Sequence, residues 1–167
     1  IGRINIKPTT AISTDTTADL SVDYVKKHNL ELLSYNYTIE NVTYDMDNEL
    51  HYKEFYEKMR NGVVPKTSLI NPEDAKVFFK KLQEKYNCHI LHIGFSSGLT
   101  GSYDTTSVAA RELMEENPDK KIIVIDSLCA SLGQGLLVHK AIKLKEKGKS
   151  LDQVEKWVED NKLNICH

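Results

Sequence analysis

The sequence contains few cysteines, and none of them lies in the spacing of a metal or redox motif. The three cysteines of the 167-residue chain are Cys88, Cys129 and Cys166, which are scattered and form no CxxC pair. Structural zinc sites and disulfide frameworks use clustered or regularly spaced cysteines. The sequence therefore indicates neither, and we expect reduced thiols.

The chain also lacks a long apolar run and a surplus of charge of one sign. No stretch approaches the roughly 18 apolar residues of a membrane span, and no basic and then apolar leader opens the sequence. The 22 basic and 24 acidic residues leave a net charge of -2, which argues against nucleic-acid binding as the main function. We expect a cytoplasmic globular protein without a membrane span.

The common motifs for phosphates and metals are missing as well. Gly98–Ser102 has no lysine before its serine, as a Walker-type loop requires, and no G-x-G-x-x-G follows a predicted strand. We interpret Gly133–Gly135 as a place of close helix packing or a flexible helix start. His89 and His92 lie three apart in a predicted strand, so they point to opposite faces and cannot chelate one ion. We expect no metal, no cofactor and no catalytic residues.

The residues that are present alternate between strand-like and helix-like patterns. Strands are predicted at 10–13, 32–39, 88–94 and 122–125, with residues 42–44 as a pairing partner of the second strand. Helices are predicted at 21–27, 52–60, 71–86, 103–116, 136–148 and 150–158. The β-branched run Ile122–Ile125 is typical of a strand buried on both faces, as in a parallel sheet. The order of the elements predicts an α/β three-layer sandwich on a mainly parallel sheet.

One polar turn lies between a predicted strand and a predicted helix. Phe95–Ser102 holds four hydroxyl side chains and two glycines, where a strand end and a helix start leave backbone N–H groups unpaired. Ligands of parallel sheets lie beyond the carboxyl ends of the strands, and the turns Thr14–Thr17 and Asp126–Ser127 belong to the same edge. The pattern favours an oxyanion site there.

Two other interpretations of these turns stay open. Gly94–Gly98 fits the G-x-S-x-G elbow of serine hydrolases, with Ser96 as nucleophile and Asp126 and His139 in the required order, although His139 falls within a helical stripe. The other interpretation is an interaction domain that binds no ligand of its own. Asp15 and Asp126 fit paired acid–base carboxylates, but acids at strand ends more often organise turns by accepting backbone hydrogen bonds.

Four motifs in order resemble the DegV family of bacterial fatty-acid-binding proteins. They are Ser13–Thr17, Pro65–Ser68, Phe95–Ser102, and Ile125–Ser127 followed by Ala130–Gly133. The resemblance covers nearly the whole chain, and four motifs in sequence are more specific than any one of them. Two departures are Leu69, where the family commonly has Gln, and the Leu-Thr-Gly-Ser sequence at 99–102, where Leu-Ser-Gly-Thr is common.

The resemblance implies a carrier of long-chain fatty acids rather than an enzyme. In the family a fatty acid lies between two domains, and its carboxylate is held by residues that correspond to Thr67 and Ser97. The supporting candidates are Ser13, Ser96, Gly98, Asp126 and Ser127. A partner fatty-acid kinase then phosphorylates the carboxylate. The resemblance also implies that residues 1–162 form the amino-terminal domain, and that 163–167 begin a strand leading to a second domain absent from this chain.

Overall fold

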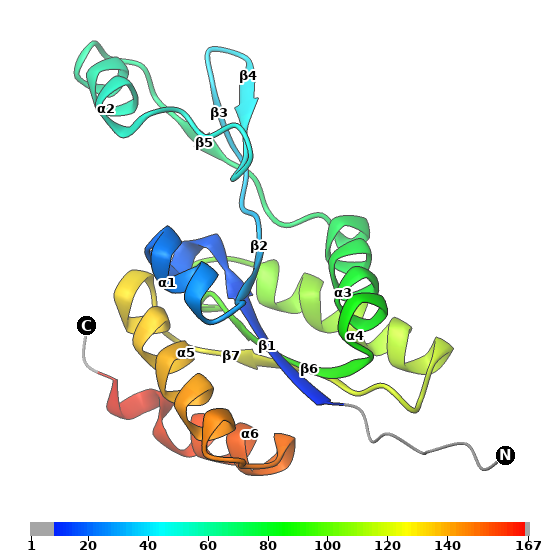
Figure 1. Ribbon diagram of the computed structural model, residues 1–167. Coiled ribbons are helices and arrows are strands. Elements are labelled where there is room, and N and C mark those ends of the chain that lie inside the picture. Colours follow the sequence, from blue (N-terminus) through cyan, green and yellow to red (C-terminus); the bar gives the residue numbers. More distant parts are fainter. Residues whose placement is uncertain (1–8, 166–167) are drawn as a thin grey trace, which may run out of the picture.

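The computed structural model describes residues 9–165 and shows a layered body from which a small lobe projects (Figure 1). The strands are β1 (Thr9–Asp15), β2 (Glu31–Leu33), β3 (Tyr37–Ile39), β4 (Val42–Tyr44), β5 (Lys66–Thr67), β6 (Cys88–Gly94) and β7 (Ile122–Asp126). The helices are α1 (Val22–Lys27), α2 (Tyr52–Arg60), α3 (Pro72–Tyr86), α4 (Ser102–Glu116), α5 (Ser131–Glu146) and α6 (Leu151–Asn161).

Four strands form a parallel sheet in the order β2-β1-β6-β7. Helices α1, α5 and α6 cover one face of this sheet, and α3 and α4 cover the other (Figure 1). Each helix turns an apolar stripe toward the sheet, because burying apolar surface is the main driving force for packing such layers. The arrangement confirms the predicted three-layer α/β sandwich.

The central strand β6 is buried on both faces. Leu91 and Ile93 pack with α5 and α6, whereas Ile90 packs with α3 and α4. His92 lies on the same side as Ile90 and is fully buried, with its ring 5.4 Å from the ring of Phe79 in an edge-to-face contact. A polar ring therefore sits in an apolar layer, where it must find hydrogen-bond partners.

The small lobe confirms the predicted pairing with residues 42–44, but it divides the single strand predicted at 32–39. The chain leaves the parallel sheet after β2, and β3 then pairs antiparallel with β4 and with β5 in a separate sheet. Glu40 and Asn41, with φ of 49° and 67°, form the two-residue turn between β3 and β4. Such a turn with two left-handed residues favours a tight hairpin, which is a local unit and does not extend the parallel sheet.

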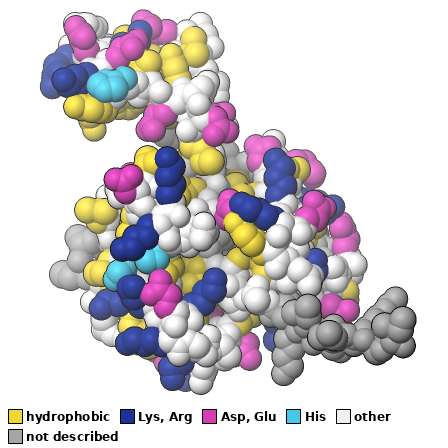
Figure 2. All heavy atoms as spheres, viewed as in Figure 1, with side chains coloured by type: hydrophobic (Ala, Val, Ile, Leu, Met, Phe, Trp, Pro, Cys, Tyr) yellow, Lys and Arg dark blue, Asp and Glu magenta, His cyan; other side chains and the backbone are white. Residues whose placement is uncertain are grey.

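Helix α2 packs against this antiparallel sheet through aromatic rings. Tyr37 stacks on Tyr44 with ring centroids 5.3 Å apart, and Phe55 of α2 meets Tyr37 edge to face at 5.5 Å. Figure 2 shows hydrophobic side chains gathered with charged ones on the surface of the lobe. Its exposed apolar side chains include Tyr52, Tyr56, Met59 and Val64.

Helix starts follow the capping residues in the sequence. The Asn71 side chain accepts a hydrogen bond from the Glu73 N–H at the start of α3, and Ser150 forms a reciprocal capping box with Gln153 at the start of α6. Capping satisfies backbone donors that a helix end leaves unpaired.

The strand predicted to begin at residue 163 is not observed in the residues that the structure describes. Lys162–Asn164 form a short 3-10 helix after α6, and only Ile165 has an extended backbone. Cys166 and His167 lie outside the described residues. The physical reason is that α6 continues into a tighter turn through local i→i+3 bonding, which the apolar residues of this segment do not reveal. The domain boundary at 162 stays a prediction.

The second glycine of Gly133–Gly135 is a site of close packing, in line with our interpretation of that segment. A Cβ atom at Gly135 would lie 2.8 Å from the Ala18 carbonyl oxygen, closer than side chains tolerate. Ala18 ends the 3-10 turn Thr16–Ala18, which follows β1. The glycine therefore lets α5 lie directly on the turn that leaves the sheet.

Both cysteines within the described residues are buried free thiols. Burial raises the pKa of Cys88, and burial followed by the negative charge of Asp126 raises the pKa of Cys129. Because the thiolate is the reactive form, we expect iodoacetamide at pH 8 to alkylate both far more slowly in the native protein than in urea. Peptide mass spectrometry over time measures this, and equal rates in both conditions would contradict it.

Candidate functional site at the carboxyl edge of the sheet

The carboxyl ends of β1, β6 and β7 lie side by side at one edge of the sheet (Figure 1). Gly94 pairs with Asp126, and Ile93 pairs with Thr14, so the turns that follow the three strands are direct neighbours. Parallel strands in register bring their polar ends together in this way. The polar turns therefore meet where the sequence predicted.

The Asp126 carboxylate forms hydrogen bonds with the loop that follows β6. Its Oδ1 accepts hydrogen bonds from the Ser97 N–H at 3.1 Å and from the Leu128 N–H at 3.1 Å, and its Oδ2 accepts from the Ser97 hydroxyl at 2.5 Å. Ser97 itself is exposed. Asp126 thus organises two turns, which favours the turn-forming interpretation of this acid.

Ser96, Gly98 and Ser127 shape the loops beside Ser97. The buried Ser96 hydroxyl accepts a hydrogen bond from the Gly98 N–H at 3.2 Å, and the Ser96 N–H donates to the Cys129 carbonyl at 3.1 Å. The Ser127 hydroxyl is fully buried and exchanges hydrogen bonds with the backbone of Cys129. The two serine hydroxyls are therefore engaged inside the loops, and Gly98 is exposed on the loop.

A chain of buried polar groups lies behind the same loop. Asp15 Oδ2 accepts from the Phe95 N–H at 2.7 Å, Asp15 Oδ1 lies 3.0 Å from His92 Nε2, and His92 Nδ1 lies 3.0 Å from the Ser13 hydroxyl. Because a carboxylate can only accept, His92 Nε2 carries a hydrogen, and in the neutral ring Nδ1 accepts from Ser13. Asp15 thereby fixes the first residue of the loop.

Ser13, His92 and Asp15 have the residue types of a catalytic triad, but the serine hydroxyl is not accessible to a substrate. Ser13 and His92 have no exposed surface, and Asp15 is 2% exposed. A nucleophile must reach a substrate, and here no solvent reaches the hydroxyl. Ser13 therefore supports the loop from inside the sheet and does not itself face a ligand.

The hydrolase hypothesis gains no support from the geometry. Ser96 is buried, and its hydroxyl bonds to the Gly98 N–H. His139 lies on α5 and bonds through Nδ1 to the Tyr24 hydroxyl at 2.8 Å. Asp126 bonds to Ser97 and not to a histidine, so no hydrogen bond within residues 9–165 joins the three proposed partners.

Thr67 lies in the small lobe, on a segment that returns to the loop. It is exposed on β5, opposite Tyr37 of β3. Three residues later, the Ile70 N–H donates to the Ser102 hydroxyl at 3.1 Å, at the start of α4. The structure shows no hydrogen bond between Thr67 and Ser97 among the residues that it describes, so their joint action on one ligand stays a prediction.

Two buried residues of this region were missed by the sequence reasoning. The sequence analysis weighs His92 only as a metal ligand together with His89. In the structure, His89 Nδ1 accepts a hydrogen bond from the Lys121 N–H at 3.0 Å. Gln134 donates through Nε2 to the Thr14 hydroxyl at 2.9 Å and accepts from Thr17 at 3.0 Å. The only available signal was a polar residue within an apolar run, which marks a buried hydrogen bond but does not name its partner.

One pocket lies within the lobe, one lies between the lobe and the body, and one lies at the amino end of β1. Thr67 lines a largely aromatic pocket of about 720 Å³ with Tyr37 and Phe55, and Thr17 and Met46 line another of about 640 Å³ between lobe and body. The second of these pockets lies next to the carboxyl end of β1, because Thr16 and Thr17 line it.

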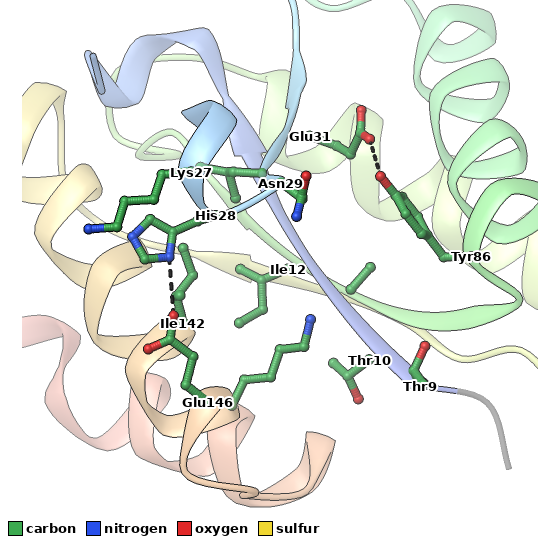
Figure 3. Close-up of a pocket in the computed structure, with 13 residues that line it drawn as sticks. Thr9, Thr10, Ile12, Lys27, His28, Asn29, Glu31, Tyr86, Ile142 and Glu146 are labelled. Carbon is green, nitrogen blue, oxygen red and sulfur yellow. Dashed lines mark hydrogen bonds and ion pairs between the residues drawn. The ribbon is translucent and has the colours of Figure 1, made fainter. Parts of the chain in front are cut away.

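A third pocket, of about 430 Å³, lies at the amino end of β1 (Figure 3). There, His28 Nδ1 lies 3.1 Å from Glu146 Oε1, and the Tyr86 hydroxyl donates to Glu31 at 2.7 Å. This pocket is on the opposite edge of the sheet from Ser97, because β1 runs from Thr9 to Asp15. Within residues 9–165, no cluster of His, Cys, Asp or Glu is placed to hold a metal ion.

The DegV family model, described as an uncharacterised protein family, matches residues 9–167. The chain belongs to the DegV family. A DegV domain-containing protein of Clostridium perfringens is 41% identical over 160 residues, which are 93% of this chain and 54% of the relative. The chain thus spans about half the length of the curated DegV relatives that it matches.

Solved DegV structures share the fold of this chain. A fatty-acid-binding DegV family protein of Thermus thermophilus superposes with a TM-score of 0.81 at 28% identity, covering 92% of this chain and 53% of the other. DegV of Bacillus subtilis, described as a fatty acid binding protein, gives a TM-score of 0.80 at 25% identity, with coverages of 93% and 54%. The α/β architecture of this chain is therefore that of DegV proteins. No helix within residues 9–165 is long and apolar enough to cross a membrane.

Proposed function

We propose that the protein binds a long-chain fatty acid and holds its carboxylate at the carboxyl edge of the sheet, through Thr67 and Ser97. The observation that carries the proposal is the likeness in fold and sequence to DegV proteins that bind fatty acids. The loop at Ser97 is exposed at the edge where parallel sheets bind ligands.

The surroundings of the loop suit an amphiphile. Leu99, Leu128 and Leu132 are 66%, 41% and 65% exposed. Leu99 lies in the loop Phe95–Ser102, Leu128 directly follows Asp126–Ser127, and Leu132 lies in the first turn of α5. Leu69, 62% exposed, lies with its methyl groups 4.0 Å from the position of a Cβ on Gly101. Apolar side chains around a polar turn fit a ligand with a charged head and a hydrocarbon tail, and burial of the tail contributes about 0.8 kcal/mol per CH₂.

The finer part of the proposal concerns the use of the bound acid. The protein acts as a carrier without a cofactor and without catalysis of its own, and it presents the carboxylate to a partner kinase for phosphorylation. It does so in the cytoplasm. The chain spans about half the length of the relatives that it matches, so the binding of the acyl tail is proposed for the whole protein.

We expect Thr67→Ala and Ser97→Ala each to weaken fatty-acid binding. A hydrogen bond to a charged group contributes roughly 1.5–3 kcal/mol, so each loss raises the Kd by about 10- to 150-fold. Titration with a fluorescent fatty acid measures this, and mass spectrometry of the denatured protein identifies the acid carried from expression.

Thr43→Ala serves as the matched control, because Thr43 is an exposed threonine on β4 that bonds to Thr38 across the hairpin. It should leave the Kd unchanged. Absence of any released fatty acid, together with no binding of added fatty acid, would refute the carrier function.

A further inference from the structure

A small pocket between α5 and α6 lies apart from the site at Ser97. The two helices lie side by side on one face of the sheet (Figure 1). The pocket has a volume of about 260 Å³ and is lined by His139, Lys140, Lys143, Leu144, Lys147 and Trp157. Within residues 9–165, no acidic side chain lines it. The pocket therefore offers a ligand positive charge and hydrogen-bond donors.

The three lysines of the pocket share one face of α5 and of the turn that follows it. Lys140, Lys143 and Lys147 are spaced by three and four residues, which makes them neighbours on a helix surface. Lys143 pairs with Glu146 at 2.7 Å, whereas Lys140 and Lys147 form no ion pair within residues 9–165. Like charges at this spacing destabilise a helix, and a bound anion would remove that repulsion.

The helix dipole does not account for Lys140. Basic side chains are stabilising in the last turn of a helix, where Lys143 and Lys145 lie in α5. The effect falls off within that turn, and Lys140 lies more than one turn before the end of α5 at Glu146. An anion in the pocket would stabilise the Lys140 charge, which the dipole does little to stabilise.

Two ring side chains add donors to the same pocket. His139 Nδ1 lies 2.8 Å from the Tyr24 hydroxyl. When that hydroxyl donates to Nδ1, the hydrogen of the neutral imidazole is on Nε2, where it can be donated to a ligand. Trp157 contributes an indole N–H, which can only donate, and its ring packs against the apolar core. Such a set of side-chain donors favours a ligand with several acceptor oxygens.

We propose that this pocket binds the phosphate group of a small soluble compound. A phosphate monoester has a charge of about −1.5 to −2 at pH 7 and three strong acceptor oxygens. These properties match the two lysines without an acidic partner and the two ring N–H donors. Neither Thr67 nor Ser97 lines the pocket, so the proposal is independent of the fatty-acid function.

Trp157 is the only tryptophan of the 167-residue chain, so its fluorescence reports on this pocket. The experiment titrates the protein with inorganic phosphate and, separately, with acetate. Potassium chloride keeps the ionic strength constant, because salt screens exposed charges. We expect a saturable change in Trp157 emission with phosphate and no saturable change with acetate. Isothermal titration calorimetry gives the Kd of phosphate independently.

Lys140→Gln and Lys147→Gln each remove one charge from the pocket. We expect each to raise the Kd of phosphate about two- to fivefold, and the double variant to raise it about tenfold, in line with exposed ion pairs. Lys81→Gln is the matched control, because Lys81 is an exposed lysine on α3, which covers the opposite face of the sheet. It should leave the Kd unchanged. Circular dichroism checks that each variant is folded.

Vesicles of phosphatidylcholine that contain phosphatidic acid test the other source of a phosphate group, a lipid surface. A response to these vesicles without a response to inorganic phosphate would overturn the assignment of a soluble ligand. An equal response to acetate would also overturn it, as would equal Kd values for the double variant and Lys81→Gln. Each of these results leaves fatty-acid binding at Ser97 untouched.

Discussion

Replacing Asp15 with alanine is expected to lower the free energy of unfolding by about 2–6 kcal/mol, because two buried hydrogen-bond donors lose their acceptor. The carboxylate is 2% exposed and accepts hydrogen bonds from the Phe95 N–H and from His92 Nε2. Alanine would leave both donors buried without a partner, and each orphaned group carries its own desolvation penalty. Urea unfolding followed by circular dichroism measures the change.

Two comparison variants make this result interpretable. Asp15→Asn keeps one acceptor oxygen and should cost less than alanine, because only one of the two donors loses its partner. Asp119→Ala, at an exposed site, should stay within about 0.5 kcal/mol of the wild type. A loss at Asp15 no larger than at Asp119 would show that the network behind the loop does not stabilise the fold.

Replacing Phe79 with alanine is expected to cost about 3–5 kcal/mol, the range for removing a large buried aromatic ring. Phe79 on α3 has no exposed surface and packs with Ile90 and Ile122 of the sheet. Its ring also meets His92 edge to face, at an angle of 80°. The cavity left by alanine cannot close, because the backbone of the sheet on its far side is held by strand pairing.

Thermal and urea unfolding give this loss, and the matched control is Val77→Ala on the same helix. Val77 is 48% exposed, so its truncation should change the stability by only about 0.5 kcal/mol. Phe79→Leu keeps most of the buried volume and should lose less than Phe79→Ala. If Phe79→Ala and Val77→Ala lowered the free energy of unfolding by similar amounts, Phe79 would not be a main contributor to the core.

Local patterns in the sequence were sufficient for most of the parallel body. The apolar run at Cys88–Gly94 and the helical stripe at Tyr52–Arg60 predicted β6 and α2 with the bounds that the structure has. Asn71 with Pro72, and Ser150, marked two helix starts correctly. These signals are local, because caps and periodicity depend on residues within one or two turns of each other.

The division of residues 32–39 between two sheets and the buried network could not be predicted in this way. Residues 32–39 have one continuous β-prone pattern, yet they divide between two sheets, and Thr67 belongs to the second of them. His92 finds Asp15, 77 residues away in the sequence. Partners so distant are chosen by the packing of whole elements, which no short window contains.

The sequence by itself determined the fold class, the DegV resemblance and the edge of the sheet where the polar turns meet. Only the tertiary structure decided what each of those side chains does. In the structure, Ser13 is buried behind the loop and Ser97 is exposed. The N–H and the hydroxyl of Ser97 both donate hydrogen bonds to Asp126. The reason is physical: residue types reveal which groups can donate and accept, whereas the geometry of the neighbouring strands decides which of them meet.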